Sequence, residues 1–351
     1  MASELAALLQ EIMDIESVSG NERELADLVE ARLSGLDHLE VFRDGDCVVA
    51  RTGLGRGERV VIAGHLDTVP LLDNLPSRYE ERPEGDVVWG RGACDMKGGV
   101  AVMLRLAEEI TEPSRDLTWI FYDHEEVDAA RNGLGRLSRN RPGLIEADFA
   151  ILMEPTSAQI EGGCQGTIRV ELVTNGTAAH SARAWMGVNA IHALAPALDT
   201  LAAYVSEEIE VEGLVYREGL NAVAVSGGVA TNMIPPSAVL TVNYRYAPDK
   251  STDEALARIE AWFPGYELHV TDSSPAARPG LDRQLAREFV TAVGAEAHPK
   301  YGWTDVARFS ELGVPAVNYG PGDPSYAHRA DEFCPVADLD TCAAALRRFL
   351  S

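Results

Sequence analysis

The sequence has few cysteines and no long apolar run, and each shortage excludes a class of protein. Its 351 residues include five cysteines, an odd number with no C-x-x-C spacing, which argues against a disulfide framework and a structural zinc knuckle. No apolar stretch approaches the roughly 20 residues that span a bilayer. The segment from Met1 to Leu5 lacks the basic region and apolar core of a secretory signal. We therefore expect a cytoplasmic protein that does not insert into a membrane.

Basic residues are also scarce. Lysine and arginine number 30 against 55 aspartates and glutamates, so the formal net charge is −25. Nucleic acids and anionic membrane surfaces bind to basic patches, and we expect neither as a partner. A small anionic substrate held by a few arginines remains compatible with this charge. The hydrophobic fraction of 46% is that of a globular protein, and the length is that of about two domains.

What the sequence does contain is a series of apolar strands that end in acids or histidine. The three strands are Val60–Ala63, followed by Gly64-His65-Leu66-Asp67; Leu117–Tyr122, followed by Asp123-His124-Glu125-Glu126; and Ala147–Met153, followed by Glu154. Residues i and i+2 of an extended chain share a face, so His65 and Asp67 can converge beyond the strand, where open α/β sheets bind ligands. A carboxylate there can orient an imidazole that binds a metal. The three strand ends predict one site.

Two loops add candidate ligands to this site. One is the glycine-rich loop around Asp95, which lacks the G-x-x-x-x-G-K-[ST] order of a phosphate cradle, and the other is the polar loop that reaches His328. The candidate metal ligands are His65, Asp95, Glu126, Glu154 and His328. Imidazole and carboxylate together suit Zn²⁺, or Co²⁺ and Mn²⁺. Five ligands exceed the need of one catalytic zinc and fit two ions, and of the adjacent Glu125 and Glu126 one can bind metal while the other faces the water and accepts its proton.

The pattern changes near Gly166 and indicates an inserted domain. Strands and helices are predicted over Thr167–Val173, Asn189–Tyr204, Asn221–Gly227, Ala238–Tyr246, Thr252–Phe263 and Tyr266–Thr271. This βαββαβ order is that of the ferredoxin-like split unit. Before it we expect a helix over 3–16 and a second helix that a capping box of Asn21 and Glu24 begins. After the linker 273–280 we expect a helix over 284–293, a strand over Ala316–Tyr319, a polar loop that reaches His328, and a final helix that ends at Leu350. We predict a catalytic domain of residues 1–165 and 279–351 and an inserted domain of residues 166–278.

Four of these motifs together resemble the M20 family of di-zinc amidohydrolases. They are Gly64–Pro70, Gly92–Gly99, Glu125-Glu126 and Glu154-Pro155-Thr156. The resemblance implies a zinc-peptidase-like α/β/α catalytic domain and an inserted lid that forms a homodimer. It also implies that Asp95 bridges two ions, that Glu154 joins His65 on one and Glu126 joins His328 on the other. It assigns the general base to Glu125 and a supporting catalytic role to Asp67, and it implies a cis peptide bond between Asp95 and Met96.

Within the family, the resemblance is strongest to the actinobacterial succinyl-diaminopimelate desuccinylases. It rests on Glu125–Gly135, Ala179–Ile191 and Gly302–Phe309, and it implies hydrolysis of N-succinyl-LL-2,6-diaminopimelate, a small anionic acyl-amino acid. The residues that the resemblance assigns to the substrate are Arg183, Asn232, Arg245 and Thr304. It also implies that His180 crosses a two-fold axis and donates to the oxyanion in the partner's site.

Two alternatives stay open on the sequence. Another M20 deacylase, such as an acetylornithine deacetylase or an aminoacylase, would share the metal ligands and differ in the inserted domain. A metal-free relative kept as a binding protein would not need all five ligands and the base, which are all present here.

Overall fold

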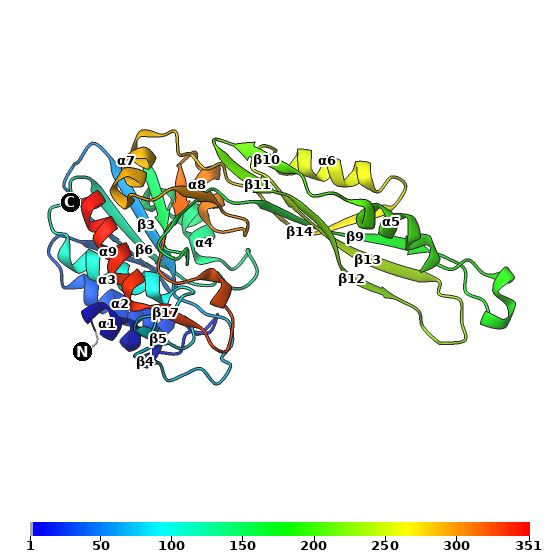
Figure 1. Cartoon of the computed structure of the whole chain (residues 1–351), viewed down its shortest axis with the longest axis horizontal. Coiled ribbons are helices and arrows are strands. Elements are labelled where there is room, and N and C mark those ends of the chain that lie inside the picture. The colour runs from blue at the N-terminus through cyan, green and yellow to red at the C-terminus, as the bar shows by residue number, and fades with distance from the viewer. Residues whose placement is uncertain (1–2) are drawn as a thin grey trace. The chain divides into compact units, whose positions relative to one another are not determined.

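The computed structural model describes residues 3–351, which form two compact units (Figure 1). Unit 1 contains the chain up to Gly162, together with Pro279–His298 and Arg308–Ser351, and unit 2 contains Gly163–Arg278 and Pro299–Ala307. The chain thus leaves unit 1 and returns to it close to the expected boundaries. Residues 299–307, which we expected in the catalytic domain, group with unit 2 instead. Met1 and Ala2, with which the predicted catalytic domain begins, lie outside the described residues.

A mixed eight-stranded sheet forms the centre of unit 1, in the order β1-β2-β6-β3-β7-β16-β8-β15. Its strands are β1 (Glu40–Asp44), β2 (Cys47–Arg51), β3 (Arg59–His65), β6 (Asp116–Tyr122), β7 (Phe149–Leu152), β8 (Ile160–Gly162), β15 (Ala297–Pro299) and β16 (Ala316–Asn318). The central strand β3 pairs in parallel with both β6 and β7. All residues of β6 and β7 are buried, as in parallel strands that are covered on both faces. The carboxyl ends of these three strands therefore meet at one edge.

Helices cover this sheet and share its core. They are α1 (Glu4–Met13), α2 (Arg23–Ser34), α3 (Lys97–Glu109), α4 (Gly133–Asn140), α7 (Gln284–Val293), α8 (Val306–Glu311) and α9 (Val336–Leu350), with short 3₁₀ turns at Pro142–Leu144 and Pro324–Tyr326. Apolar side chains of α1, α3, α7 and α9 belong to one buried cluster with those of the sheet. The first and last segments of the chain thus build a common core. No helix among residues 3–351 has the length and apolar character to cross a membrane.

The predicted capping box at the start of α2 is wrong. Helix α2 begins at Arg23 with Glu22 at its N-cap position, and no side chain caps it. The Glu22 carboxylate instead accepts hydrogen bonds from the backbone of Gly20 and of His124. A tertiary contact with a distant loop has replaced the local cap that the spacing suggested.

A small antiparallel sheet, which the sequence did not predict, joins two distant segments of unit 1. Its order is β17-β5-β4, with β4 (Arg78–Glu80), β5 (Val87–Trp89) and β17 (Phe333–Pro335). Phe333 pairs with Trp89, so the residues after β5 lie beside the residues before β17. This register brings the loop of Asp95 next to the loop of His328.

Unit 2 has the expected βαββαβ order. Its four-stranded sheet runs β12-β13-β9-β14, with β9 (Gly166–Asn175), β12 (Gly219–Gly227), β13 (Ser237–Tyr246) and β14 (Glu267–Ser274). Alternate residues of β13 are buried against α5 (Ala195–Ala203) and α6 (Thr252–Trp262), which lie on one side of the sheet (Figure 1). The helix predicted over Asn189–Tyr204 is shorter than expected, because its first part forms a 3₁₀ turn, His192–Leu194, that follows another at Ser181–Met186. A hairpin of β10 (Glu208–Val211) and β11 (Leu214–Arg217) was not predicted.

Candidate metal centre

The five predicted metal ligands come together in unit 1 at the edge where the central strands end. Three groups of three have ligand atoms that all lie within 4.8 Å of one another: His65, Asp95 and Glu154; His65, Glu125 and Glu126; and Asp95, Glu126 and His328. Asp95 belongs to the first and the last of these groups. The carboxylate of Asp95 thus lies between two sets of donors, which is the arrangement a pair of bridged ions requires.

Distances around Asp95 show how it connects the two groups. Its Oδ1 lies 3.2 Å from His65 Nε2, and its Oδ2 lies 3.3 Å from His328 Nε2. His328 Nε2 is also 3.0 Å from Glu126 Oε1. The peptide bond between Asp95 and Met96 is cis, as the family resemblance implied. Each oxygen of one carboxylate therefore faces a different imidazole.

The surroundings of these imidazoles favour a positive charge. Burial alone would lower the pKa of His65, but the hydrogen bond to Asp95 and the nearby carboxylates outweigh it and raise that pKa well above its ordinary value. Contacts with Asp95 and then Glu126 raise the pKa of His328 to about 10. Conversely, burial would raise the pKa of Asp95, but His328 and His65 hold it low. Three carboxylates against two imidazoles keep the group of candidate ligands negative even when both rings are protonated, and oxygen and nitrogen donors of this kind fit divalent cations.

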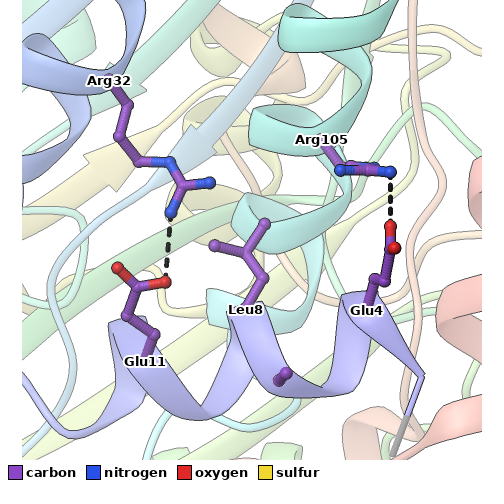
Figure 2. Close-up of a pocket in the computed structure, with 6 residues that line it drawn as sticks. Glu4, Leu8, Glu11, Arg32 and Arg105 are labelled. Atoms are coloured by element: carbon purple, nitrogen blue, oxygen red, sulfur yellow. Dashed lines mark hydrogen bonds and ion pairs between the residues drawn. The ribbon is translucent and has the colours of Figure 1, made fainter.

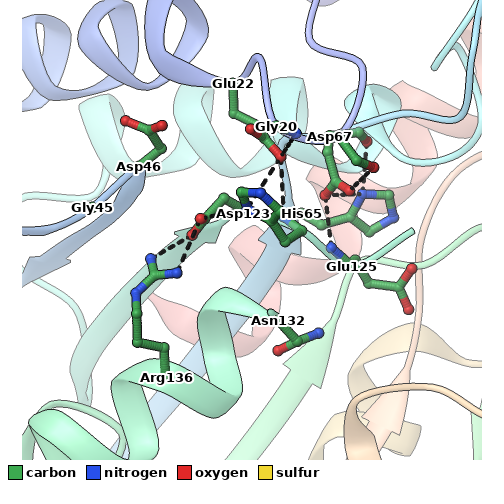
Figure 3. A network of polar contacts seen from close by, with 12 residues as sticks. Gly20, Glu22, Gly45, Asp46, His65, Asp67, Asp123, Glu125, Asn132 and Arg136 are labelled. Carbon is green, nitrogen blue, oxygen red and sulfur yellow. Dashed lines mark hydrogen bonds and ion pairs between the residues drawn. The ribbon is translucent and has the colours of Figure 1, made fainter. Parts of the chain in front are cut away.

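We expected the carboxylate of Asp67 to orient the ring of His65, but the main-chain oxygen of Asp67 is the closer partner of that ring. The ring nitrogen Nδ1 of His65 lies 2.9 Å from the main-chain oxygen of Asp67, and 3.6 Å from its carboxylate. The Asp67 carboxylate accepts hydrogen bonds from the backbone N–H groups of Glu125, at 2.9 Å, and Glu126, at 3.0 Å (Figure 3). Ser19 Oγ donates to the same carboxylate at 2.6 Å. The main chain of Asp67 holds the imidazole, while its side chain holds the segment of the two glutamates.

A second buried network supports the segment before Glu125. Asp123, at the end of β6, accepts two hydrogen bonds from Arg136 of α4 and lies 2.7 Å from the ring of His124 (Figure 3). The backbone N–H of His124 donates to Glu22, whose side chain is fully buried. Sequence reasoning missed Ser19, Glu22 and Arg136, because none of them lies in a motif with the ligands.

The residues expected to bind substrate lie in unit 2. His180 is exposed, and its Nδ1 accepts a hydrogen bond from the backbone of Ala182, while Asn232 accepts one from the backbone of Ser181 through its main-chain oxygen. Arg183 is exposed and Arg245, on β13, is partly buried; within residues 3–351 neither guanidinium has an ion-pair partner. Thr304 is buried, and its main-chain oxygen lies 3.7 Å from Cys164 Sγ. All five residues belong to unit 2.

A hollow elsewhere on unit 1 has no free charge to offer a ligand. It measures about 370 Å³ and is lined by α1, Arg32 and Arg105 (Figure 2). Arg32 pairs with Glu11 and Glu108, and Arg105 pairs with Glu4 and Glu109. These exposed pairs join the surfaces of three helices and contribute little stability individually.

Comparison with known sequences agrees with this geometry. The sequence model of the family described as peptidase family M20/M25/M40 matches residues 61–351. A Mycobacterium tuberculosis protein, provisionally named succinyl-diaminopimelate desuccinylase DapE, is 51% identical over 97% of this chain and 96% of its own length. A Corynebacterium glutamicum protein named succinyl-diaminopimelate desuccinylase is 44% identical over 98% of this chain and 95% of its own.

Solved structures with low sequence identity share the fold. A tripeptidase from Staphylococcus aureus has a TM-score of 0.80 at 19% identity and covers 99% of this chain and 96% of its own. A Bacillus subtilis protein described as a dinuclear metal-binding peptidase from the M20 family has a TM-score of 0.70 at 17% identity, covering 98% and 96% of the two chains. The mixed α/β architecture is therefore the one these structures have.

Proposed function

The chain belongs to peptidase family M20/M25/M40, and from this premise we propose that it hydrolyses the amide bond of N-succinyl-LL-2,6-diaminopimelate to succinate and LL-2,6-diaminopimelate. The observation that carries the proposal is the position of Asp95 between two groups of donors. The names of the two relatives at 51% and 44% identity support the choice of substrate. Such a reaction would serve lysine and diaminopimelate biosynthesis in the cytoplasm.

The donor set fits two divalent ions, with Zn²⁺ as the first choice and Co²⁺ or Mn²⁺ as alternatives. His65 and Glu154 would hold one ion, Glu126 and His328 the other, and Asp95 would bridge them. When bound, the ions supply Lewis acidity, which polarises the amide carbonyl and lowers the pKa of water.

Glu125 would be the general base of the reaction. It lies next to the ligand Glu126, and the hydrogen bond from its backbone to Asp67 fixes the start of its side chain. Its carboxylate accepts the proton of the attacking water and passes it to the nitrogen of the leaving group, so that the C–N bond breaks with release of a neutral amine and not of an amide anion. Asp67 serves this step as a positioning residue.

Residues of unit 2 would recognise the substrate. Arg183 and Arg245 have no ion-pair partner within residues 3–351, and a guanidinium can bind a carboxylate through two parallel hydrogen bonds. Asn232 and Thr304 would add neutral contacts. We further propose a homodimer through residues 166–278, in which His180 donates to the oxyanion in the partner's active site.

The test is a comparison of acyl groups on the same protein. Chelation should abolish hydrolysis and added Zn²⁺ or Co²⁺ should restore it. Turnover is then measured on N-succinyl-LL-2,6-diaminopimelate and on N-acetyl-ornithine. A site built to bind a second carboxylate rejects a substrate that lacks it by several orders of magnitude. Equal kcat/KM on both substrates, or full activity after removal of metal, would contradict the proposal.

The arginines allow a sharper version of this comparison. Arg183→Ala and Arg245→Ala should lower kcat/KM mainly for the succinylated substrate, because only that substrate loses an ion pair. Arg139→Ala, on α4 of unit 1, is a matched control that removes an arginine from elsewhere. Equal losses on the succinylated and acetylated substrates would favour a general deacylase.

A further inference from the structure

A buried ion pair lies behind the candidate metal centre and joins the two loops that carry Asp95 and His328. Arg91 follows β5 and Glu332 precedes β17, and Arg91 Nη1 lies 2.7 Å from Glu332 Oε2. The side chains are only 2% and 1% exposed. The proposed reaction assigns no chemical role to either residue.

The Glu332 carboxylate holds the backbone at the bridging residue. Its second oxygen, Oε1, accepts hydrogen bonds from the N–H groups of Cys94 and Asp95, each at 3.2 Å. The main-chain oxygen of Glu332 also accepts a hydrogen bond from Gly90, at 3.0 Å. These contacts continue the pairing of Phe333 with Trp89 beyond the end of the small sheet. Glu332 therefore determines where the backbone of Asp95 lies.

Arg91 and Asn74 hold the other loop. Arg91 Nη2 lies 3.5 Å from the main-chain oxygen of His328, and the fully buried Asn74 donates to the main-chain oxygen of Arg329 at 3.4 Å. The backbone N–H of Arg91 in turn donates to Asn74 at 3.0 Å. His328 has a backbone φ of +66°, which residues other than glycine rarely adopt unless their neighbours hold them there. The direction of the His328 ring thus depends on these contacts.

We propose that Arg91 and Glu332 are a positioning pair that sets the spacing between Asp95 and His328, and thereby the affinity for the ion bound by Asp95, Glu126 and His328. This inference rests on the proposed dimetal function and adds to it the residues that tune one of the two ions. His65 lies at the end of β3, and the contacts of Arg91 and Glu332 described above do not include it. Because Asp95 belongs to both groups of donors, a shift of its backbone affects both ions, but His328 belongs to one group only, so the pair acts more strongly on the ion of that group.

The experiment measures metal binding directly. The metal-free protein is titrated with Co²⁺, and the two binding steps are followed by calorimetry and by visible absorbance. His328→Ala, which removes a donor from one group only, identifies the step that belongs to that group. Glu332→Gln removes the charge opposite Arg91 and turns an amide N–H toward either Arg91 or the backbone N–H groups. It should weaken the same step as His328→Ala by about 10–100-fold, the usual effect of changing a residue that supports a metal ligand.

Two further variants separate positioning from general stability. Glu332→Asp keeps the charge opposite Arg91 and withdraws the oxygens from the backbone of Asp95, so it should fold and still weaken the same step. Glu218→Gln is the matched control: Glu218 of unit 2 is also buried, pairs with Lys250 and accepts a hydrogen bond from the backbone of Ala247. It should destabilise the protein while both Co²⁺ affinities stay at the wild-type values.

The Co²⁺ titration and the turnover measurement test the positioning pair and the proposed function separately. Unchanged binding of both ions in a folded Glu332→Gln or Glu332→Asp protein would overturn the proposal, and so would an equal loss at both steps. Turnover of the succinylated substrate by the wild type is measured separately. A wild type that binds two ions and leaves this substrate intact would contradict the proposed function and leave the positioning pair standing.

Discussion

Both carboxylate oxygens of Asp67 accept hydrogen bonds from the backbone of Glu125 and Glu126, the proposed base and a proposed metal ligand. Replacing Asp67 with asparagine turns a donor toward one of these N–H groups, so the segment must move. A displacement of about 1 Å at a catalytic group can cost 10²-fold in rate. We predict that Asp67→Asn lowers kcat by about 10²-fold while both metal ions stay bound, as measured by steady-state kinetics and metal analysis. Ser19→Ala, which leaves both backbone contacts intact, should lower kcat less than tenfold; an equal loss would contradict this role for Asp67.

Glu125 and Glu126 are neighbours with different expected roles, which a pair of variants can separate. Glu125→Gln removes the proton acceptor and keeps the size of the side chain, so kcat should fall by at least 10²–10⁴-fold, the typical contribution of a general base. Its metal content should remain at two ions per chain. Glu126→Gln should instead lose one ion, because Glu126 lies 3.0 Å from His328 and shares its group of donors. Metal analysis after dialysis checks both outcomes, and loss of an ion from Glu125→Gln would reverse the assignment.

Among the elements, β6 begins with a carboxylate that stabilises a neighbouring loop. Asp116 accepts hydrogen bonds from Thr52 Oγ1 and from the backbone of Leu54 and Arg56. Burial disfavours its charged form, but these hydrogen bonds outweigh burial and hold its pKa below the ordinary value. A depressed pKa stabilises the fold above the ordinary value of about 4, and this stabilisation is lost as the pH falls through the folded-state pKa.

We therefore predict that Asp116→Asn lowers the free energy of unfolding by about 2 kcal/mol at pH 7, in the range of hydrogen bonds to a charged group. The difference from the wild type should shrink steadily between about pH 5 and pH 2. Denaturant unfolding of the metal-free proteins at several pH values measures it. Asp199→Asn, on exposed α5, should show no difference at any pH. A difference for Asp116→Asn that stays constant down to pH 2 would contradict the charge-based explanation.

Elements whose signal is local could be predicted, and those held by distant partners could not. The strand that ends at His65, the strand that ends at Tyr122 and the βαββαβ order all follow from apolar runs and their spacing. The start of α2 could not be predicted, because Glu22 is engaged by a backbone N–H of His124. That the five candidate ligands gather at one edge of the sheet could be predicted from strand ends and motifs. The pair Arg91 and Glu332 could not, since the two residues are 241 positions apart and meet only through the small sheet.

At the scale of the whole molecule, unit 2 presents an open sheet edge. Strand β12 is the last strand of its sheet, and Asn221–Gly227 are exposed, with Val225 at 63%. An edge strand with unpaired backbone groups can pair with another chain. This feature supports the proposed homodimer, in which His180 would serve the partner's site.

Mixing two inactive variants tests that arrangement. In a heterodimer of His180→Ala and Glu125→Ala, the first chain keeps its base and receives the histidine of the second. Activity should return after subunit exchange, up to one working site per heterodimer. Two samples of the same variant mixed together are the control and should remain inactive. If the mixed variants also remain inactive although exchange has occurred, His180 acts within its own chain or not at all.

The insertion of unit 2 also determines the order in which the ribosome synthesises the candidate metal donors. His65, Asp95 and Glu154 all precede Gly163, so the ribosome completes this group of donors before it begins unit 2. His328 follows only after unit 2 has been synthesised. A chain interrupted during the insertion already contains the whole group of His65, Asp95 and Glu154 and lacks the histidine of the group of Asp95, Glu126 and His328. Synthesis therefore completes the two groups of donors around Asp95 in a fixed order, and only a chain extended past His328 contains both.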